Sequence, residues 1–373
     1  MSPVCAKHGV KAIQLVGWND GGQDQGNPSH DFDSRLGTFN ELKEAIARIQ
    51  SMGVKVILFA KFTWADRATE NFRKNLIKYA IKDPYGDYYV HPGYQYQTAT
   101  QFLDINTKRL IPMCFLSEEY LALCNVEFKK ILALGADGIL FDECLHHGPS
   151  LLCFDISHKH RYGAPVYAND SKLIENFSRL IPPGREFLFA GEACYDWELD
   201  VYHLSYHRSE SKEHIPLSRY MRTDGPLMTA VTGFNDRNMI NQCLMYRYII
   251  SYEPYNFKGK LEDFPLTLEY GKKMDGLRTK LKGYFWDGQF LGEEGAAVTT
   301  SDHKPYKPFA VFRNRMNQKI GMVILNYDEA NSVAVRVKAD GCSLNQYRTV
   351  DNPEWITLKD DIEIPPCSAV VVI

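Results

Sequence analysis

The sequence predicts an α/β protein: a (β/α)8 barrel of the TIM type, followed by a small C-terminal antiparallel β-sandwich. Over residues 1–289, apolar runs of strand length alternate with longer segments of helical periodicity, which indicates βα units around a parallel sheet. These apolar runs are continuous, as expected for strands that are covered on both faces. Over residues 290–373 the runs are short and alternate with polar residues, which is typical of a sandwich. We therefore expect two domains with these bounds.

The elements of the barrel follow in order from these runs. The clear strands are predicted at 11–18, 54–62, 98–106, 137–142 and 185–193. A weaker sixth strand is predicted at 218–225 and a seventh at 245–254, and the eighth is not evident. Helices are predicted at 38–53, 69–81 and 117–135. Thr38 and Ser117 are suitable N-cap residues for two of these helices, and Gly53 for the end of the first.

The composition excludes several classes of function. The chain has 373 residues, of which 45% are apolar and 24% charged, as in an ordinary globular protein. The net charge of -3 leaves no basic surface of the kind that nucleic acid requires, so we expect no nucleic-acid partner. No nucleotide-binding motif of the GxGxxG or GxxxxGK[ST] type follows a predicted strand. Aromatic residues make up 13%, which suits a site that stacks on sugar rings.

Location and redox state follow from what the sequence lacks. No apolar run approaches the ~20 residues of a membrane span, and no signal peptide is visible, so we expect a cytoplasmic protein without membrane contact. It would be secreted or periplasmic if a leader has been removed. The cysteines stand singly and read as reduced thiols; they are Cys5, Cys114, Cys124, Cys144, Cys153, Cys194, Cys243, Cys342 and Cys367. The sequence does not indicate the oligomeric state.

The active site of such a barrel lies at the carboxyl ends of its strands, so the polar and aromatic residues there are the candidates. Those that we expect at the site are Trp18, Asp20, Lys61, Trp64, Asp104, Asp142, His146, Glu192, Trp197, Arg222 and Asp224. Carboxylates with interleaved tryptophans and few cations are typical of a glycosidase. Two acids then flank the bond that is cleaved, and the aromatic rings bind the sugar faces. The expected partner is an oligosaccharide or a glycoconjugate, with no cofactor.

Four segments carry a resemblance to a known group of enzymes: "VGW", "MGVKVILFAKF", "FLDINT" and "GADGILFDE". Their order resembles the clan of retaining α-glycosidases that includes α-galactosidases and α-xylosidases. It is similar, more distantly, to the α-amylase and dextranase groups. The resemblance covers residues 11–225 and the C-terminal sandwich, and it assigns no specific family. It implies a catalytic barrel whose fourth strand ends in an Asp nucleophile, at Asp142.

The resemblance leaves the general acid open between two residues. In the α-galactosidase clan it is an Asp after strand six, which corresponds to Asp224. In the α-amylase and dextranase groups it is a Glu after strand five, which corresponds to Glu192. We favour Glu192, because an ionisable group directly after "FLFAG" has no obvious structural purpose and partial burial would raise its pKa. Asp224 could instead pair with Arg222 and bind sugar hydroxyls.

Other patterns near these residues favour plainer interpretations. Glu143 adjoins Asp142, and since strand neighbours point to opposite faces we expect it to face away from the site. His158 and His160 form a His-x-His pair similar to that of metal-dependent barrel hydrolases, but it is not at the end of strand one and no matching ligands are evident. We therefore expect no metal. Two alternatives stay open, a metal-dependent barrel hydrolase and a non-catalytic carbohydrate-binding barrel.

Overall fold

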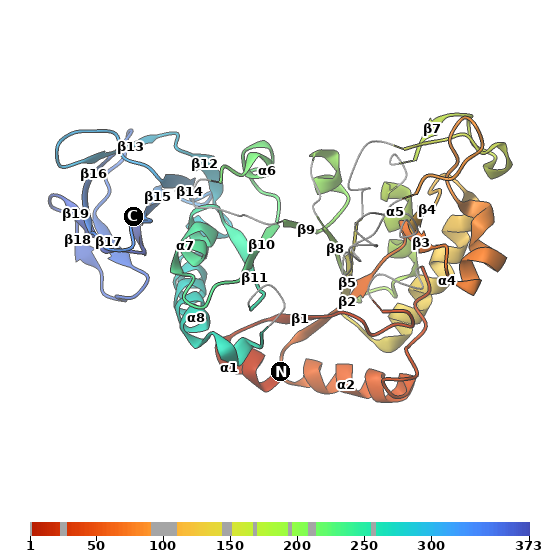
Figure 1. The fold of residues 1–373 in the computed structure, drawn as a ribbon. Helices are drawn as coiled ribbons and strands as arrows, with labels where there is room; N and C mark the ends of the chain where they lie inside the picture. The colour runs from red at the N-terminus through yellow and green to blue at the C-terminus, as the bar shows by residue number, and fades with distance from the viewer. Residues whose placement is uncertain are drawn as a thin grey trace. The chain divides into compact units, whose positions relative to one another are not determined.

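The computed structural model describes residues 2–22, 28–90, 110–143, 151–166, 170–192, 196–207, 214–254 and 259–373. The chain forms two compact units (Figure 1). The first comprises Ser2–Ala6 and Val10–Tyr206, and the second comprises His207–Ile373 together with Lys7–Gly9.

The first unit is built around parallel strands. Its elements are α1 (Ser2–His8, which continues into the second unit), β1 (Ala12–Leu15), α2 (Phe39–Ser51), β2 (Lys55–Ala60), β3 (Trp64–Asp66), η1 (Phe72–Leu76), η2 (Ile77–Tyr79), β4 (Leu110–Pro112), α4 (Glu118–Leu134), β5 (Gly138–Phe141), β6 (Leu152–Cys153), η3 (Ile156–His158), β7 (Ala164–Pro165), α5 (Asp170–Leu180), β8 (Leu188–Glu192), η5 (Asp196–Asp200) and β9 (Leu204–His207). The parallel strands lie in the order β1-β2-β5-β8-β9, and β3 pairs with β4 and β6 with β7, both antiparallel.

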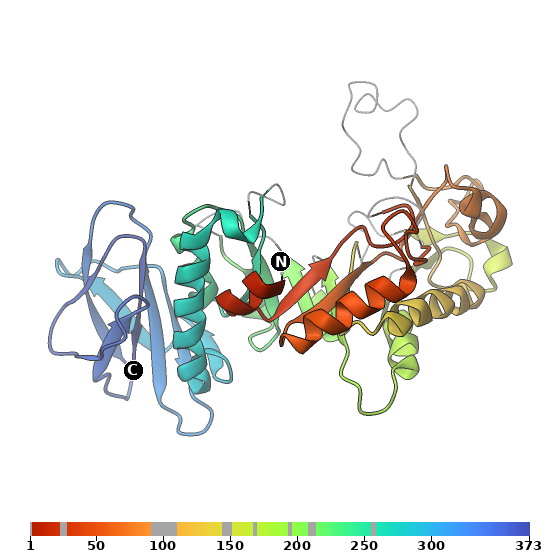
Figure 2. The same cartoon turned by 90° about the horizontal axis from the view of Figure 1, so that it is seen from below.

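The central strands β2 and β5 are buried along most of their length, because helices cover the sheet. All of β5 and all of β2 after its first residue are buried. Figure 1 shows α2, α4 and α5 outside the strands. Figure 2 shows α2 and α4 next to each other, and they are in contact. The predicted caps of both helices are present, with Thr38 accepting from the backbone of Glu41 and Ser117 from that of Tyr120.

Two expectations for this unit need correction. The predicted helix at 69–81 consists of two short turns, η1 and η2. Asp142 was expected after the fourth strand, but β5 pairs directly with β2, so it follows the third parallel strand in the order of the described sheet. The run at 98–106, which was predicted as the third strand, lies outside the described residues. The strands predicted from the runs around 54–62, 137–142 and 185–193 are confirmed as β2, β5 and β8.

The second unit combines two parallel strands, helices and a sandwich. Its elements are α6 (Leu217–Met221), β10 (Leu227–Val231), α7 (Arg237–Met245), β11 (Tyr248–Tyr252), η6 (Leu261–Asp263), α8 (Pro265–Lys280), α9 (Lys282–Phe285), β12 (Gln289–Gly292), β13 (Ala296–Thr300), β14 (Phe309–Arg313), β15 (Ile320–Asn326), β16 (Val333–Ala339), β17 (Gln346–Thr349), β18 (Ile356–Thr357), β19 (Ile362–Ile364) and β20 (Ser368–Val372). β10 and β11 are parallel, and the remaining strands form sheets β12-β14-β15-β20-β17-β18 and β13-β16-β19.

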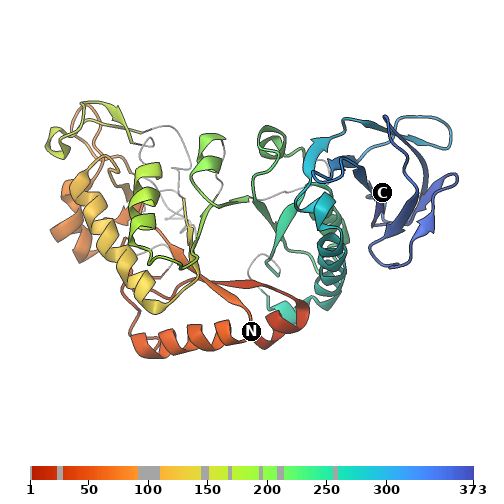
Figure 3. The ribbon, with the colours of Figure 1, turned by 180° about the vertical axis from the view of Figure 1, so that it is seen from behind.

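The predicted C-terminal antiparallel sandwich is confirmed, and its core comes from alternating apolar residues. Met322 and Ile324 of β15, Val370 of β20 and Val335 of β16 are fully buried in one cluster. Helices also pack on this sandwich, since α7 contacts β15 and β20 (Figure 3, helices in teal beside the blue strands). The compact units divide after Tyr206, and the antiparallel strands begin at Gln289 with β12.

The segment 218–225 is not the predicted strand. Residues 217–221 form α6, and the strand of this region is β10, later in the chain. The seventh predicted strand, 245–254, is confirmed as β11. Among the helices of the described residues, none combines the length and the apolar character that crossing a membrane requires.

Candidate active site

Three ionisable residues stand at the same level of the parallel sheet. The register pairs Ala60 of β2 with Phe141 of β5, and Phe141 with Gly191 of β8. Lys61, Asp142 and Glu192 are the next residues in these three strands. The carboxyl ends of parallel strands meet at one edge, so the folding of three apolar runs brings these side chains together. Tyr206 of β9 continues the same row, since it pairs with Glu192.

Lys61 is the positive charge of this group. Its side chain is completely buried, and its Nζ lies 2.9 Å from Oδ2 of Asp142 and 3.0 Å from Oε2 of Glu143. Asp142 is 8% exposed and Glu143 is 1% exposed. One ammonium group therefore faces two carboxylates in a site that water barely reaches, and each electrostatic interaction is stronger there than it would be at the surface.

Glu143 does not face away from the site, as strand alternation would require. Its backbone has φ of 47°, in the left-handed region, so the alternation ends at this residue and the side chain turns to Lys61. Thr63 Oγ1 donates to the carbonyl oxygen of Glu143 at 2.7 Å, and the backbone N–H of Glu143 donates to Oε2 of Glu192 at 3.2 Å. The expectation for Glu143 was wrong because it extended strand geometry one residue past the end of the strand.

Asp142 and Glu192 interact directly with each other. Burial raises the pKa of Asp142 well above its ordinary value, Lys61 opposes that shift, and hydrogen bonding to Glu192 together with the charges of Glu192 and Glu143 adds to it. The two carboxyl groups are therefore neighbours, as the nucleophile and the acid of a glycosidase must be.

His30 supports the site from the loop after β1, and the sequence did not single it out. It is 1% exposed, its ring stacks on Phe62 with centroids 4.4 Å apart, and its Nε2 accepts from the backbone N–H of Lys61 at 3.4 Å. Its own backbone N–H donates to Glu127 of α4 at 2.7 Å. His30 thereby connects the segment of Lys61 to helix α4. This role could not be predicted, because nothing in the sequence distinguishes a single His in a polar loop from a surface residue.

The two tryptophans that were expected to stack on sugars are buried in this structure. Trp18 and Trp64 are each 4% exposed. The indole N–H of Trp18 donates to the carbonyl oxygen of Phe59 at 2.9 Å, so this ring supports β2 rather than presenting an open face. Asp20 is exposed, in the loop after β1, and its backbone N–H donates to Asp31. Asp104, His146 and the side chain of Trp197 lie outside the described residues.

Asp224 is placed differently from what the sequence predicted. It precedes β10 and so stands at the amino end of a strand, because the segment before it is a helix. Its Oδ1 lies 2.6 Å from Nη2 of Arg315 and 3.6 Å from Nη2 of Arg247, and its side chain is 59% exposed. Arg222 is partly buried and caps the end of α6. Asp224 therefore forms ion pairs with Arg315 and Arg247.

The model of a family described as Domain of unknown function (DUF6259) matches residues 7–230, which is more than half of the chain. The chain belongs to this family. The matched region of this DUF6259 member includes Lys61, Asp142, Glu143 and Glu192. A comparison with curated proteins found no match.

Several solved structures similar to this DUF6259 chain are glycoside hydrolases. A maltogenic α-amylase from Thermotoga neapolitana has 11% identity and a TM-score of 0.62, with 100% of this chain and 90% of that chain covered. An α-amylase from Geobacillus thermoleovorans, complexed with acarbose, has 13% identity and a TM-score of 0.60, with 100% and 89% covered. An α-galactosidase from Geobacillus stearothermophilus, in complex with 1-deoxygalactonojirimycin, has 11% identity and a TM-score of 0.60, with 100% and 52% covered.

These likenesses concern the fold. The predicted class, a (β/α)8 barrel followed by an antiparallel sandwich, is confirmed for this DUF6259 member. The resemblance to barrel glycoside hydrolases that the sequence suggested is also confirmed at the level of the fold, and α-amylases and an α-galactosidase are both among the similar structures. At these identities the comparisons assign no residue a role.

Proposed function

We propose that this protein is a retaining glycoside hydrolase that cleaves an α-linked sugar with Asp142 and Glu192 as its catalytic carboxyl groups. The observation that carries this proposal is the row of Lys61, Asp142 and Glu192 at the carboxyl ends of three adjacent parallel strands. A pair of carboxyl groups in one buried site is the minimum that glycoside cleavage requires. The similar glycoside hydrolases of the same fold support this choice of reaction.

Each residue has a defined task in the first step. Asp142 attacks the anomeric carbon through a carboxylate oxygen, and the bond from that carbon to the leaving oxygen breaks. Glu192 gives its proton to that oxygen, so the departing sugar or aglycone leaves as a neutral alcohol. The ammonium of Lys61, 2.9 Å from Asp142, stabilises the ionised form in which Asp142 acts as the nucleophile.

The second step uses the same groups in reverse. Glu192, now a carboxylate, takes a proton from water, and the water oxygen attacks the anomeric carbon as its bond to Asp142 breaks. We propose retention because the sequence resembles retaining α-glycosidases, and the separation of the two carboxyl groups in a complex with substrate tests it. Retaining carboxyl groups stand ~5–5.5 Å apart, whereas inverting ones are separated by ~6.5–9.5 Å to admit a water between them.

The substrate class is proposed from the similar structures. Two of them are complexed with acarbose and with 1-deoxygalactonojirimycin, and those proteins are an α-amylase and an α-galactosidase. An oligosaccharide or glycoconjugate with an α-linkage is therefore the first class to test. We favour Glu192 over Asp224 as acid/base because Glu192 contacts Asp142, while Asp224 is paired with Arg315.

The test measures hydrolysis of a panel of nitrophenyl α- and β-glycosides by the wild type, Asp142→Asn, Glu192→Gln and the control Asp224→Asn. We expect α-glycosidase activity that both site variants reduce by at least about 1000-fold and that the control retains, since nucleophile and acid each supply large rate factors. Labelling with a 2-fluoro glycosyl fluoride should then yield a modified peptide that contains Asp142. A labelled peptide without Asp142 would reject the nucleophile assignment, and turnover unchanged in Asp142→Asn would reject the mechanism.

A further inference from the structure

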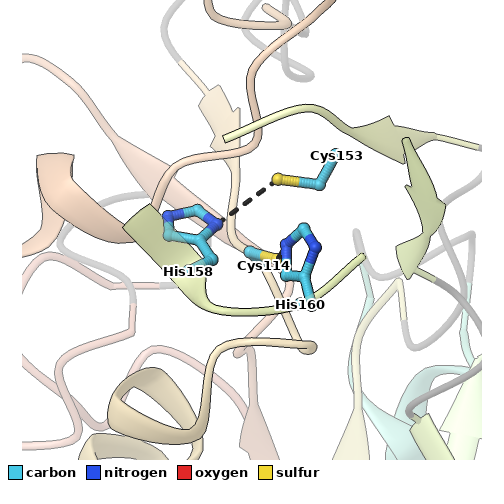
Figure 4. A group of neighbouring side chains, drawn as sticks. All are labelled: Cys114, Cys153, His158 and His160. Carbon is cyan, nitrogen blue, oxygen red and sulfur yellow. Dashed lines mark hydrogen bonds between the residues drawn. The ribbon is translucent and has the colours of Figure 1, made fainter. Parts of the chain in front are cut away.

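Two cysteines and two histidines of the first unit lie close together, and none of them belongs to the site of Lys61, Asp142 and Glu192. Cys114 follows β4, Cys153 ends β6, and His158 and His160 lie in and just after η3. One ligand atom from each, a sulfur or a ring nitrogen, lies within 4.8 Å of all the others. Figure 4 shows the four side chains turned toward a common centre. The two cysteines and His158 are buried, and His160 is partly buried.

Two sulfur–nitrogen distances in this cluster match those of a tetrahedral metal site. Cys114 Sγ lies 3.4 Å from Nε2 of His160, and Cys153 Sγ lies 3.3 Å from Nδ1 of His158. Around Zn²⁺, with Zn–S of about 2.3 Å and Zn–N of about 2.0–2.1 Å, tetrahedral angles separate a sulfur from a nitrogen by roughly 3.5 Å. The two sulfur–nitrogen distances are close to this value, and all four ligand atoms lie within 4.8 Å of one another.

The second nitrogen of each imidazole fixes which nitrogen faces the cluster. Nε2 of His158 lies 2.9 Å from the carbonyl oxygen of Lys78, and Nδ1 of His160 lies 2.8 Å from that of Arg161. A carbonyl oxygen only accepts, so both of these nitrogens carry the hydrogen. The nitrogens that face the sulfurs, Nδ1 of His158 and Nε2 of His160, are then left with free lone pairs. This backbone support of the outer nitrogen is the usual arrangement around metal-binding histidines.

We propose that Cys114, Cys153, His158 and His160 form a structural zinc site. Two sulfurs and two imidazole nitrogens are the donors that Zn²⁺ takes in closed tetrahedral sites, whereas Ca²⁺ and Mg²⁺ take oxygen ligands. Four protein ligands leave no open position for a substrate or an activated water, so the ion stabilises the fold and takes no part in hydrolysis. The proposal is independent of the glycosidase mechanism.

The position of the site explains what the ion would hold in place. Cys114 follows β4, which pairs with β3 just after Lys61, and the backbone N–H of Met113 donates to Thr63 at 2.8 Å. Cys153 and the histidines belong to the segment that follows β5 and Asp142. The zinc site thus ties together the two segments that continue from Lys61 and Asp142. Long connections after barrel strands have little core of their own, and a metal can supply the missing rigidity.

Sequence reasoning excluded a metal because the ligands of the His-x-His pair were sought at the end of strand one. Cys153 is close in sequence, but Cys114 comes from a separate connection and reaches the pair only in the fold. The local pattern Cys-x4-His-x-His supplies three of the four ligands. The fourth, Cys114, can be recognised only from the tertiary structure. The expectation of no metal stays a prediction, and the zinc site proposed for these four residues is the alternative to it.

The experiment measures zinc in the full chain by elemental analysis, with variants Cys114→Ala, Cys153→Ala and His160→Ala. Cys124→Ala is the matched control, since Cys124 is a fully buried free thiol of the same unit outside the cluster. We expect one zinc per chain in the wild type and the control, and loss of zinc from both cluster cysteine variants. His160 is the least buried ligand, so His160→Ala should fold and bind zinc at least about tenfold more weakly.

Cobalt substitution keeps the test valid if a cysteine variant fails to fold. Co²⁺ in the wild-type chain should give the thiolate charge-transfer and visible bands of a tetrahedral S2N2 site, and chelation should lower its melting temperature. Wild-type protein that holds no zinc and gives no thiolate–cobalt spectrum overturns the proposal. So does a mass spectrum that shows a Cys114–Cys153 disulfide in the purified protein, or zinc that persists in full in both cysteine variants.

Discussion

Nζ of Lys61 lies 2.9 Å from Oδ2 of Asp142, and the two residues follow register partners at the ends of adjacent parallel strands. The same ammonium is 3.0 Å from Glu143. An ion pair that is this buried gains little over apolar packing, but the loss of one partner leaves a charge without compensation. Lys61 is therefore the residue on which the charge balance of the site depends.

Replacing Lys61 by Met should destabilise the fold by about 3–5 kcal/mol at neutral pH, because Asp142 and Glu143 would remain buried beside each other without a cation. The loss should shrink at acidic pH, where protonated carboxyl groups need no counter-charge. Urea unfolding at several pH values measures both effects. Lys55→Met is the control, since Lys55 pairs with Asp137 at 3.3 Å and is 59% exposed, and we expect a change of at most ~1 kcal/mol. Equal losses at acidic and neutral pH would contradict the electrostatic explanation.

Asp142 should also impose a pH dependence on stability. Its pKa is raised in the fold, first by burial and then by its carboxyl neighbours, so the native state keeps this proton at pH values where the unfolded chain has lost it. The associated stabilisation is complete below the ordinary Asp pKa of about 3.9 and is lost as the pH rises through the raised pKa. Asp142→Asn removes this titration, so its unfolding free energy should fall less steeply from acidic to neutral pH. Parallel curves for variant and wild type would rule the effect out.

Asp224→Asn separates the two candidates for the general acid. Asp224 is 59% exposed and its partner Arg315 is 52% exposed, so breaking their contact should change stability by at most ~1 kcal/mol. If Glu192 is the acid, the variant keeps wild-type kcat and the same pH profile on the glycoside panel. A fall of kcat that spares substrates with good leaving groups would instead assign the proton transfer to Asp224.

The placement of Lys61, Asp142 and Glu192 at the carboxyl ends of strands could be predicted from the sequence. A buried parallel strand can be recognised there because it forms a continuous apolar run. The runs before Lys61, Asp142 and Glu192 end where the sequence turns polar, and that position is the carboxyl end of a strand. The turn of Glu143 toward Lys61 could not be predicted, since it depends on a left-handed backbone at one residue. Side-chain alternation holds within a strand and not beyond its last pair.

Other parts of the site depend on contacts that are distant in sequence. Whether Trp18 and Trp64 present an open face is decided by the segments that pack over them, and both are buried. The helix at 217–221 was mistaken for a strand because its short run has no clear period. The zinc ligand Cys114 stands in a different connection from Cys153, so only the tertiary structure joins them.

Gly138 tests whether the spacing of β5 and β8 positions the carboxyl pair. It is the register partner of Leu188, and a Cβ at Gly138 would stand 2.5 Å from the carbonyl oxygen and 2.7 Å from the Cβ of that residue. Gly138→Ala should therefore push the two strands apart and cost about 1–3 kcal/mol. Asp142 and Glu192 end these same strands, so glycoside hydrolysis should fall together with the melting temperature.

The control for that variant is Gly276→Ala. Gly276 lies in α8, a Cβ there meets no atom within 4 Å, and alanine should leave the helix unchanged or about 0.5–1 kcal/mol more stable. Thermal unfolding and the nitrophenyl glycoside assay on both variants measure the comparison. A Gly138→Ala protein with wild-type melting temperature and activity would show that the two strands can separate without displacing the carboxyl groups, and the positions of Asp142 and Glu192 would then have to be fixed by Lys61 and Glu143 alone.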